Sequence, residues 1–116
     1  MHASRPASYF EDGALAWLDT TCGGYPALQA HGVDLVLATV TTRYLGPVRL
    51  GEVVEVTARP AGRGRTSFQL QLDLVVDGEP RVTAMNTYVV VAGGSSADIP
   101  ELLEPALDDV PPIERA

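Results

Sequence analysis

Apolar side chains recur every three or four positions over residues 9 to 28, a spacing that places them along one face of a helix of about four turns. These positions are Phe10, Ala14, Trp17, Leu18 and Thr21/Cys22. Ser8 precedes the pattern and is a favourable N-cap, whereas the Gly23-Gly24 pair is a typical helix stop. We therefore predict one long helix that begins near Tyr9 and ends near Gly23, and its apolar face needs a sheet to bury it.

Four later segments have the composition and alternation of strands, at residues 33–44, 53–59, 65–76 and 80–91. The third is the clearest, because polar residues alternate there with Phe68, Leu70, Leu72 and Leu74. Asp77-Gly78 is a hairpin signal between the last two strands. The pattern predicts an α+β domain in which an antiparallel meander curls around one central helix.

The length of 116 residues predicts a single globular domain. No apolar run approaches the ~20 residues of a membrane span, and no basic segment followed by an apolar run marks a signal peptide. Cys22 is the only cysteine, which excludes an internal disulfide, and we interpret it as a small buried side chain rather than a nucleophile. A cytoplasmic protein without a membrane partner is expected.

Charge divides the chain near residue 92. The chain has 15 acidic and 8 basic residues and a net charge of −7, and six of the acids but only one arginine lie in 93–116. We expect a folded domain at 1–92 and an acidic tail at 93–116, with a Gly/Ser linker, a short helix over 98–104 and a disordered or loosely docked end beyond Pro105. The nearly neutral body argues against nucleic acid as a partner. Docking on a basic partner, such as a carrier-protein assembly, is one role for the tail.

Three segments resemble, in order, motifs of one family. They are YFEDG at residues 9–13, RYLGPVRLGE at 43–52 and GRGRTSF at 62–68. They resemble the start of the central helix, the crossover and the Gly-Arg-Ser hairpin of the 4-hydroxybenzoyl-CoA thioesterase-like acyl-CoA thioesterases. The resemblance implies the hotdog fold, an antiparallel sheet wrapped around one central helix, and a homodimer with sites between its protomers.

The N-terminus departs from the family pattern. Family members place a strand and an Asp-containing loop before the helix, and that Asp, which acts as base or nucleophile, has no counterpart here. His2 is the match for the histidine of that loop and becomes a catalytic candidate. Three explanations stay open: the true start codon lies upstream, the protein works without the Asp, or it is not a hydrolase.

Thioester hydrolysis needs a base that activates water and donors for the developing oxyanion. The first turn of the predicted helix would supply these donors, so the candidate oxyanion residues are Tyr9, Phe10 and Gly13. Glu11 and Asp12 are the carboxylates in reach, and at most one faces inward, because neighbours on a helix are about 100° apart. We prefer Glu11 for its longer side chain. In the alternative explanation, both acids only stabilise the helix start.

Binding of coenzyme A (CoA) would need positive charge for the phosphates at the mouth of the site. The candidate residues in the crossover and the hairpin are Arg43, Arg49, Arg63, Arg65 and Ser67. Solubilising surface charge explains any one of the arginines equally well. No cofactor is expected, and two histidines and one cysteine at unrelated spacings make no metal site.

The sequence therefore favours a hotdog-fold enzyme that hydrolyses an acyl thioester of CoA or of an acyl-carrier protein to a free acid and a thiol. The alternative is a non-catalytic hotdog protein, which binds a ligand or a partner and lacks the first strand and its Asp. A homodimer is expected in both cases, because the few predicted strands leave open edges that a second copy can pair.

Overall fold

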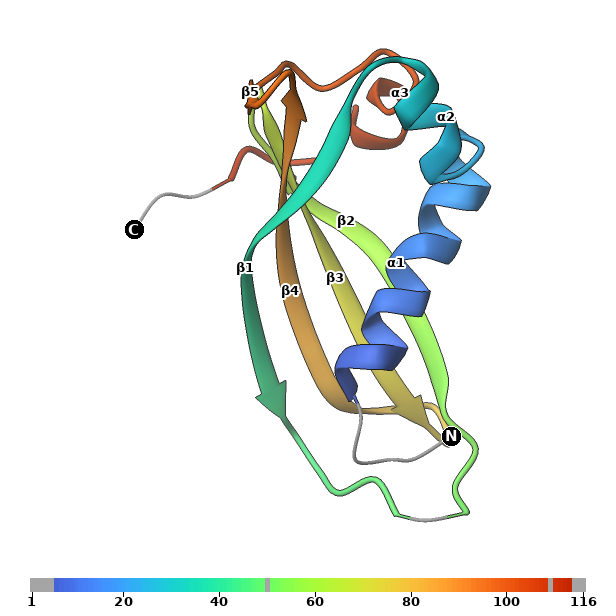
Figure 1. The fold of residues 1–116 in the computed structure, drawn as a ribbon. Coiled ribbons are helices and arrows are strands. Elements are labelled where there is room, and N and C mark those ends of the chain that lie inside the picture. The colour runs from blue at the N-terminus through green and yellow to red at the C-terminus, as the bar shows by residue number, and fades with distance from the viewer. Residues whose placement is uncertain (1–5, 50, 109, 114–116) are drawn as a thin grey trace.

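One long helix packs on one face of an antiparallel sheet (Figure 1). The structure is a computed structural model and describes residues 6–49, 51–108 and 110–113. Its elements are α1 (Pro6–Cys22), α2 (Tyr25–Ala30), β1 (Asp34–Tyr44), β2 (Glu55–Arg63), β3 (Ser67–Val76), β4 (Glu79–Ala92), β5 (Ser95–Ser96) and α3 (Glu104–Leu107). The predicted α+β class and the antiparallel sheet are confirmed.

The strand order is β1-β4-β3-β2, with β5 paired to β4, and all these pairs are antiparallel. The predicted meander is therefore correct only for β2, β3 and β4. β1 lies beside β4, and the loop after β1 carries the chain to β2 at the opposite edge (Figure 1). Alternation within a strand identifies its two faces but not its neighbours, so the pattern alone did not place β1.

The core lies between α1 and the inner face of the sheet. Every second residue of β3 is buried, as its alternation predicted: Phe68, Leu70, Leu72, Leu74 and Val76. The α1 side chains buried against them are Phe10, Ala14 and Leu18. The spacing of three and four residues thus identified the face of the helix that packs on the sheet.

β1 is exposed on both faces along most of its length. α1 packs over β2 and β3 and leaves β1 uncovered (Figure 1). Val36, Leu37 and Val40 are 50%, 49% and 51% exposed, and Tyr44 is 72% exposed. We refer to these four residues as the β1 apolar surface.

The ends of α1 differ in how well the sequence predicted them. α1 begins at Pro6, three residues before the predicted start, so Ser8 lies inside the helix and is not its N-cap. Proline is well accommodated at the first helical position, because its missing N–H group has no partner there. The predicted stop is confirmed: Gly23 and Gly24 have φ angles of 90° and 97°, and the Gly24 N–H group donates to the Leu18 carbonyl at 3.0 Å.

The C-terminal segment packs into the fold. Ile99, Leu103 and Leu107 are at most 6% exposed and belong to the core. At the edge of β2, the Arg63 N–H group donates to the Pro111 carbonyl at 3.0 Å and the Ile113 N–H group donates to the Arg63 carbonyl at 3.1 Å. The expectation of a loose end beyond Pro105 is therefore wrong for the residues described. The short helix lies at Glu104–Leu107, later than predicted.

Candidate active site

The two candidate carboxylates leave α1 in different directions. Phe10 points into the core, and each further residue turns about 100° around the helix axis. Glu11 therefore lies on the flank that faces β4, and Asp12 points away from the sheet. Both side chains are exposed in the single chain, so the rest of that chain shields neither carboxylate from solvent.

A polar pair lies on the inner face of β4, on the same side as Glu11. The Asn86 Nδ2 atom donates a hydrogen bond to the Tyr88 hydroxyl at 3.0 Å. Asn86 is only 5% exposed, and its Oδ1 atom is buried without a hydrogen-bond partner among the described residues. A buried polar atom in this state costs about 1–3 kcal/mol of stability. Such a cost in an otherwise apolar core needs an explanation, and a functional role is one.

The Tyr88 ring and hydroxyl each contact a neighbouring side chain, and Tyr88 remains partly exposed. Its ring stacks on Phe68 at a centroid distance of 5.6 Å. Burial raises the pKa of the Tyr88 hydroxyl above its usual value of 10.0, the hydrogen bond from Asn86 lowers it, and the negative charge of Glu11 raises it. The Glu11 carboxylate is thus close enough to Tyr88 for the two groups to interact electrostatically.

Two of the three predicted oxyanion residues, Phe10 and Gly13, lie beyond the first turn of α1. A helix that begins at Pro6 leaves free only the N–H groups that precede its first hydrogen-bonded turn. Tyr9 is the fourth helical residue, and Phe10 and Gly13 follow within the hydrogen-bonded body of α1. The N–H groups of Phe10 and Gly13 are engaged inside the helix, so these two residues are not free to donate to an oxyanion.

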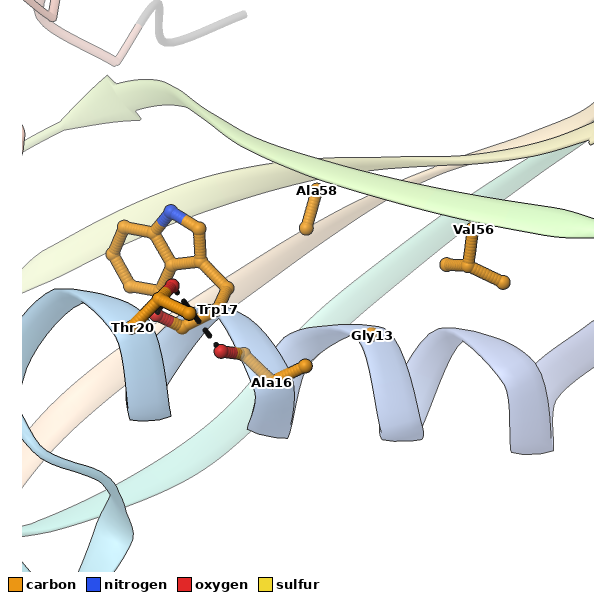
Figure 2. Close-up of a pocket in the computed structure, with 6 residues that line it drawn as sticks. All are labelled: Gly13, Ala16, Trp17, Thr20, Val56 and Ala58. Atoms are coloured by element: carbon orange, nitrogen blue, oxygen red, sulfur yellow. Dashed lines mark hydrogen bonds between the residues drawn. The ribbon is translucent and has the colours of Figure 1, made fainter.

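A groove runs between α1 and β2 on the other flank of the helix (Figure 2). Its volume is about 200 Å³, and it is lined by Gly13, Ala16, Trp17, Thr20, Val56 and Ala58. The Thr20 hydroxyl hydrogen-bonds to the Ala16 and Trp17 carbonyls at 3.3 and 3.1 Å, so it turns back onto the helix. The groove lining is therefore largely apolar. Gly13 belongs to this groove, whereas Glu11 lies about 160° around the helix from it and faces the opposite side.

The candidate CoA-binding residues do not form one cluster. Arg63 and Arg65 lie at the β2–β3 hairpin, where Arg63 pairs with Glu104 at 2.6 and 3.0 Å and Arg65 pairs with Asp98 at 3.3 Å. Arg43 lies near the other end of the sheet, opposite Thr83 on β4. Both arginines of the hairpin are therefore already paired with acids of the C-terminal segment.

The remaining candidates have separate surroundings. Arg49 is exposed in the loop after β1, remote from the hairpin. The Ser67 carbonyl accepts the Gly64 N–H group at 2.7 Å and so closes the hairpin. His2 lies outside the residues that the structure describes. Within those residues, no three side chains that could ligate a metal come together, and no helix is long and apolar enough to span a membrane.

Sequence reasoning missed the Asn86–Tyr88 pair. The inner-face residues around it on β4 are Val82, Ala84 and Val90, each at most 2% exposed. An asparagine within this alternating apolar series was the one available signal. The importance of this asparagine for a site depends on how close it lies to Glu11, and that follows only from the packing of α1 against the sheet.

Residues 1–83 match the family model described as the thioesterase superfamily. The chain belongs to this superfamily. The resemblance to hotdog-fold thioesterases is thereby confirmed, and membership supports thioester hydrolysis as the general chemistry. The sequence matches none of the curated proteins with which it was compared.

Several solved structures share the fold of this thioesterase-superfamily protein. A Thermus thermophilus protein is 26% identical, with a TM-score of 0.81 over 93% of this chain and 84% of that one. A second protein from Thermus thermophilus, a thioesterase solved with coenzyme A and Zn, is 24% identical, with a TM-score of 0.76 over 92% and 82%. A Staphylococcus aureus protein solved in complex with CoA is 19% identical, with a TM-score of 0.81 over 100% and 78%.

Proposed function

We propose that this protein hydrolyses acyl-CoA thioesters and that Glu11 is the base that activates water. The observation that carries the proposal is the position of Glu11, the carboxylate of α1 that faces the polar pair on the inner sheet face. Two structures of the same fold were solved with CoA, which supports CoA as the carrier. An acyl-carrier protein, which presents its acyl group on the same kind of thiol, is the alternative carrier.

The reaction requires only the substrate, one water molecule and a base. Glu11 takes a proton from water as the water oxygen attacks the thioester carbonyl carbon, and the carbonyl electron pair moves onto oxygen. The tetrahedral oxyanion then reforms the carbonyl and expels the thiolate. The thiolate takes up the proton held by Glu11, so the products are a carboxylic acid and a thiol.

A second copy of the chain would complete the site. Glu11 is exposed in one chain, so shielding from water must come from outside it. Leu37, Val40 and Tyr44 of the β1 apolar surface lie on the same sheet face as the polar pair of β4, and Val36 lies on the other face. The outer edge of β1 has no neighbouring strand among the described residues. A two-fold partner on this edge would extend the sheet and enclose the Glu11 side of α1.

Thiol release from short, medium and long acyl-CoAs tests the proposal. The single equivalent of thiol that Cys22 contributes to the reagent is subtracted. We expect Glu11→Gln to lower kcat by about 100-fold or more, because the change removes the base while keeping size and polarity. Asp12→Asn is the matched control and is expected to retain kcat within about twofold, because Asp12 points away from the sheet.

Equal turnover by Glu11→Gln and the unmodified protein would overturn the role of Glu11. The exposure of both carboxylates favours a second candidate function, a non-catalytic hotdog protein that binds acyl-CoA. Saturable binding of acyl-CoA without product, by folded protein at every chain length, would select that alternative.

The acidic tail is less available for a basic partner than its charge suggested, because Asp98 and Glu104 are paired within the chain.

A further inference from the structure

The inner face of β4 carries a polar pair where an apolar pair would fit. Asn86 lies opposite Leu70 of β3 and Val40 of β1, and Tyr88 lies opposite Phe68 and Leu37. Each of these four neighbours on the same face is apolar. An apolar residue at position 86 would remove a buried amide oxygen that has no partner among the described residues. The fold alone therefore does not explain Asn86.

The hydrogen bond between the two side chains has a direction. Asn86 Nδ2 donates to the Tyr88 oxygen, so the hydroxyl hydrogen of Tyr88 is free to be donated elsewhere. Phe68 fixes the plane of the ring, and Asn86 fixes the position of the hydroxyl. A hydroxyl held in this way is a pre-oriented donor, and Tyr88 is exposed enough for a ligand to reach it.

The charge around Tyr88 keeps this donor protonated. Burial raises the pKa of Tyr88, and the Glu11 carboxylate raises it in addition, whereas the hydrogen bond from Asn86 lowers it. Because the net effect is upward from 10.0, the hydroxyl carries its hydrogen throughout the neutral range. A donor and a carboxylate that can accept a proton thus lie near each other on one side of α1.

Two of the predicted oxyanion donors are not free, because the N–H groups of Phe10 and Gly13 are engaged within α1. We propose that the Tyr88 hydroxyl donates a hydrogen bond to the thioester carbonyl oxygen, and that Asn86 is the positioning residue that aims this hydroxyl. This inference rests on the proposed hydrolysis under Glu11 and adds the group that stabilises the oxyanion. As the carbonyl electron pair moves onto oxygen, the hydrogen bond from Tyr88 strengthens, and no proton is transferred from Tyr88.

Tyr88→Phe is the direct test, because it removes the hydroxyl and retains the ring that stacks on Phe68. We expect kcat for acyl-CoA hydrolysis to fall by about 10–100-fold, with a change in KM of less than about threefold, because the hydrogen bond is strongest in the transition state. The melting temperature should fall, because Asn86 Nδ2 loses its acceptor, so kcat is compared at a temperature at which both proteins are fully folded. Tyr25→Phe, at another partly buried tyrosine in the same core cluster, is the matched control and should retain full kcat.

Asn86→Leu tests the positioning role. The variant removes the unpaired amide oxygen, so its melting temperature should be equal or higher, whereas its kcat should fall as in Tyr88→Phe. In the double variant, Asn86→Leu should cause no further loss of kcat, because Asn86 acts only through the hydroxyl that Tyr88→Phe has removed. A purely structural Asn86 would instead lower the melting temperature and add its own loss to the double variant.

The outcomes separate this inference from the proposed function. If Glu11→Gln abolishes turnover but Tyr88→Phe retains the kcat of the unmodified protein, the role of Tyr88 is refuted and hydrolysis under Glu11 stands. If the unmodified protein binds acyl-CoA without turnover, Tyr88→Phe should weaken binding of acyl-CoA but not of free CoA, and equal weakening of both would refute the inference. Absence of both turnover and binding would overturn the two proposals together.

Discussion

Gly13 determines how closely α1 approaches the sheet. A Cβ atom at this position would lie 2.7 Å from Cγ1 of Val56 and 3.2 Å from Cδ2 of Leu72. The first distance is shorter than any ordinary carbon contact, and the branched valine on β2 cannot swing away as a long side chain would. The absence of a side chain at residue 13 therefore sets the spacing between α1 and β2, and with it the position of Glu11 two residues earlier.

Gly13→Ala should destabilise the protein by about 1 kcal/mol. Alanine gains about 1 kcal/mol of helix propensity over glycine, but overpacking against Val56 costs typically 1–3 kcal/mol. Urea unfolding of Gly13→Ala measures the balance. In a Val56→Ala background the close contact is relieved, so Gly13→Ala should there become neutral or stabilising. Equal effects in the two backgrounds would show that contact with Val56 does not set the spacing.

At the same scale, the sequence offered one residue of the proposed site. Glu11 was preferred over Asp12 for its longer side chain, and helical geometry allows at most one of two neighbours to face the sheet. Asn86 and Tyr88 could not be selected, because the roles proposed for them depend on how α1 packs on the sheet, and α1 and β4 lie far apart in the sequence. Short sequence motifs indicate local backbone structure, whereas the proposed site forms only when segments far apart in the sequence pack together.

Among the elements, the C-terminal segment is held against β2 by an ion pair as well as by its buried leucines. The Arg63 guanidinium holds Glu104 through two hydrogen bonds, at 2.6 and 3.0 Å, with side chains that are 25% and 39% exposed. Arg65 and Asp98 form a more exposed pair at 3.3 Å. The end beyond Pro105 was predicted to be disordered or loosely docked, because its Pro and acidic content resembles disordered sequence. Leu107, which is fully buried, and the backbone hydrogen bonds of Arg63 with Pro111 and Ile113 hold the described part of that end in place.

Glu104→Gln should lower the free energy of unfolding at pH 7 by about 0.5–1 kcal/mol, because a partly exposed but fork-like pair is lost. Hydrogen bonding from Arg63 lowers the pKa of Glu104 below its usual value of 4.5. The contribution of the pair is therefore complete above pH 4.5 and is lost as the pH falls through the lowered pKa. The two proteins should thus become equally stable in acid.

Urea unfolding of both proteins between pH 3 and 8 measures this difference. Asp98→Asn is the matched control, and it should change stability little at any pH, because the side chains of that pair are 82% and 71% exposed. A difference between Glu104→Gln and the unmodified protein that persists undiminished at low pH would show that the ion pair is not its source.

At the scale of the whole molecule, the sheet has one unprotected side. Helix α1 covers β2 and β3, and the C-terminal segment covers the end of β2 (Figure 1). No described residue pairs with the outer edge of β1, and most of its residues are exposed. An edge strand with large apolar side chains is prone to aggregation unless a partner covers it. The strand itself was predictable from its β-branched residues, but its place at an open edge was not, because that place depends on the crossover to the opposite edge.

We expect the protein to be a homodimer through β1, and Val40→Asp should dissociate it. In a two-fold interface each substitution occurs twice, so two unpaired charges would be buried and the dissociation constant should rise by about 100-fold or more. Val53→Asp is the matched control: Val53 is 86% exposed in the loop before β2 and lies outside the β1 apolar surface, so this variant should remain dimeric. Light scattering after size-exclusion chromatography, over a range of protein concentrations, gives the mass of each species. If Glu11 depends on the second copy for shielding, the turnover per chain of Val40→Asp should rise with protein concentration as dimer forms, whereas that of Val53→Asp should stay constant.

A monomeric mass for the unmodified protein at micromolar concentration, with full turnover, would refute both the dimer and the role of the second copy in the site.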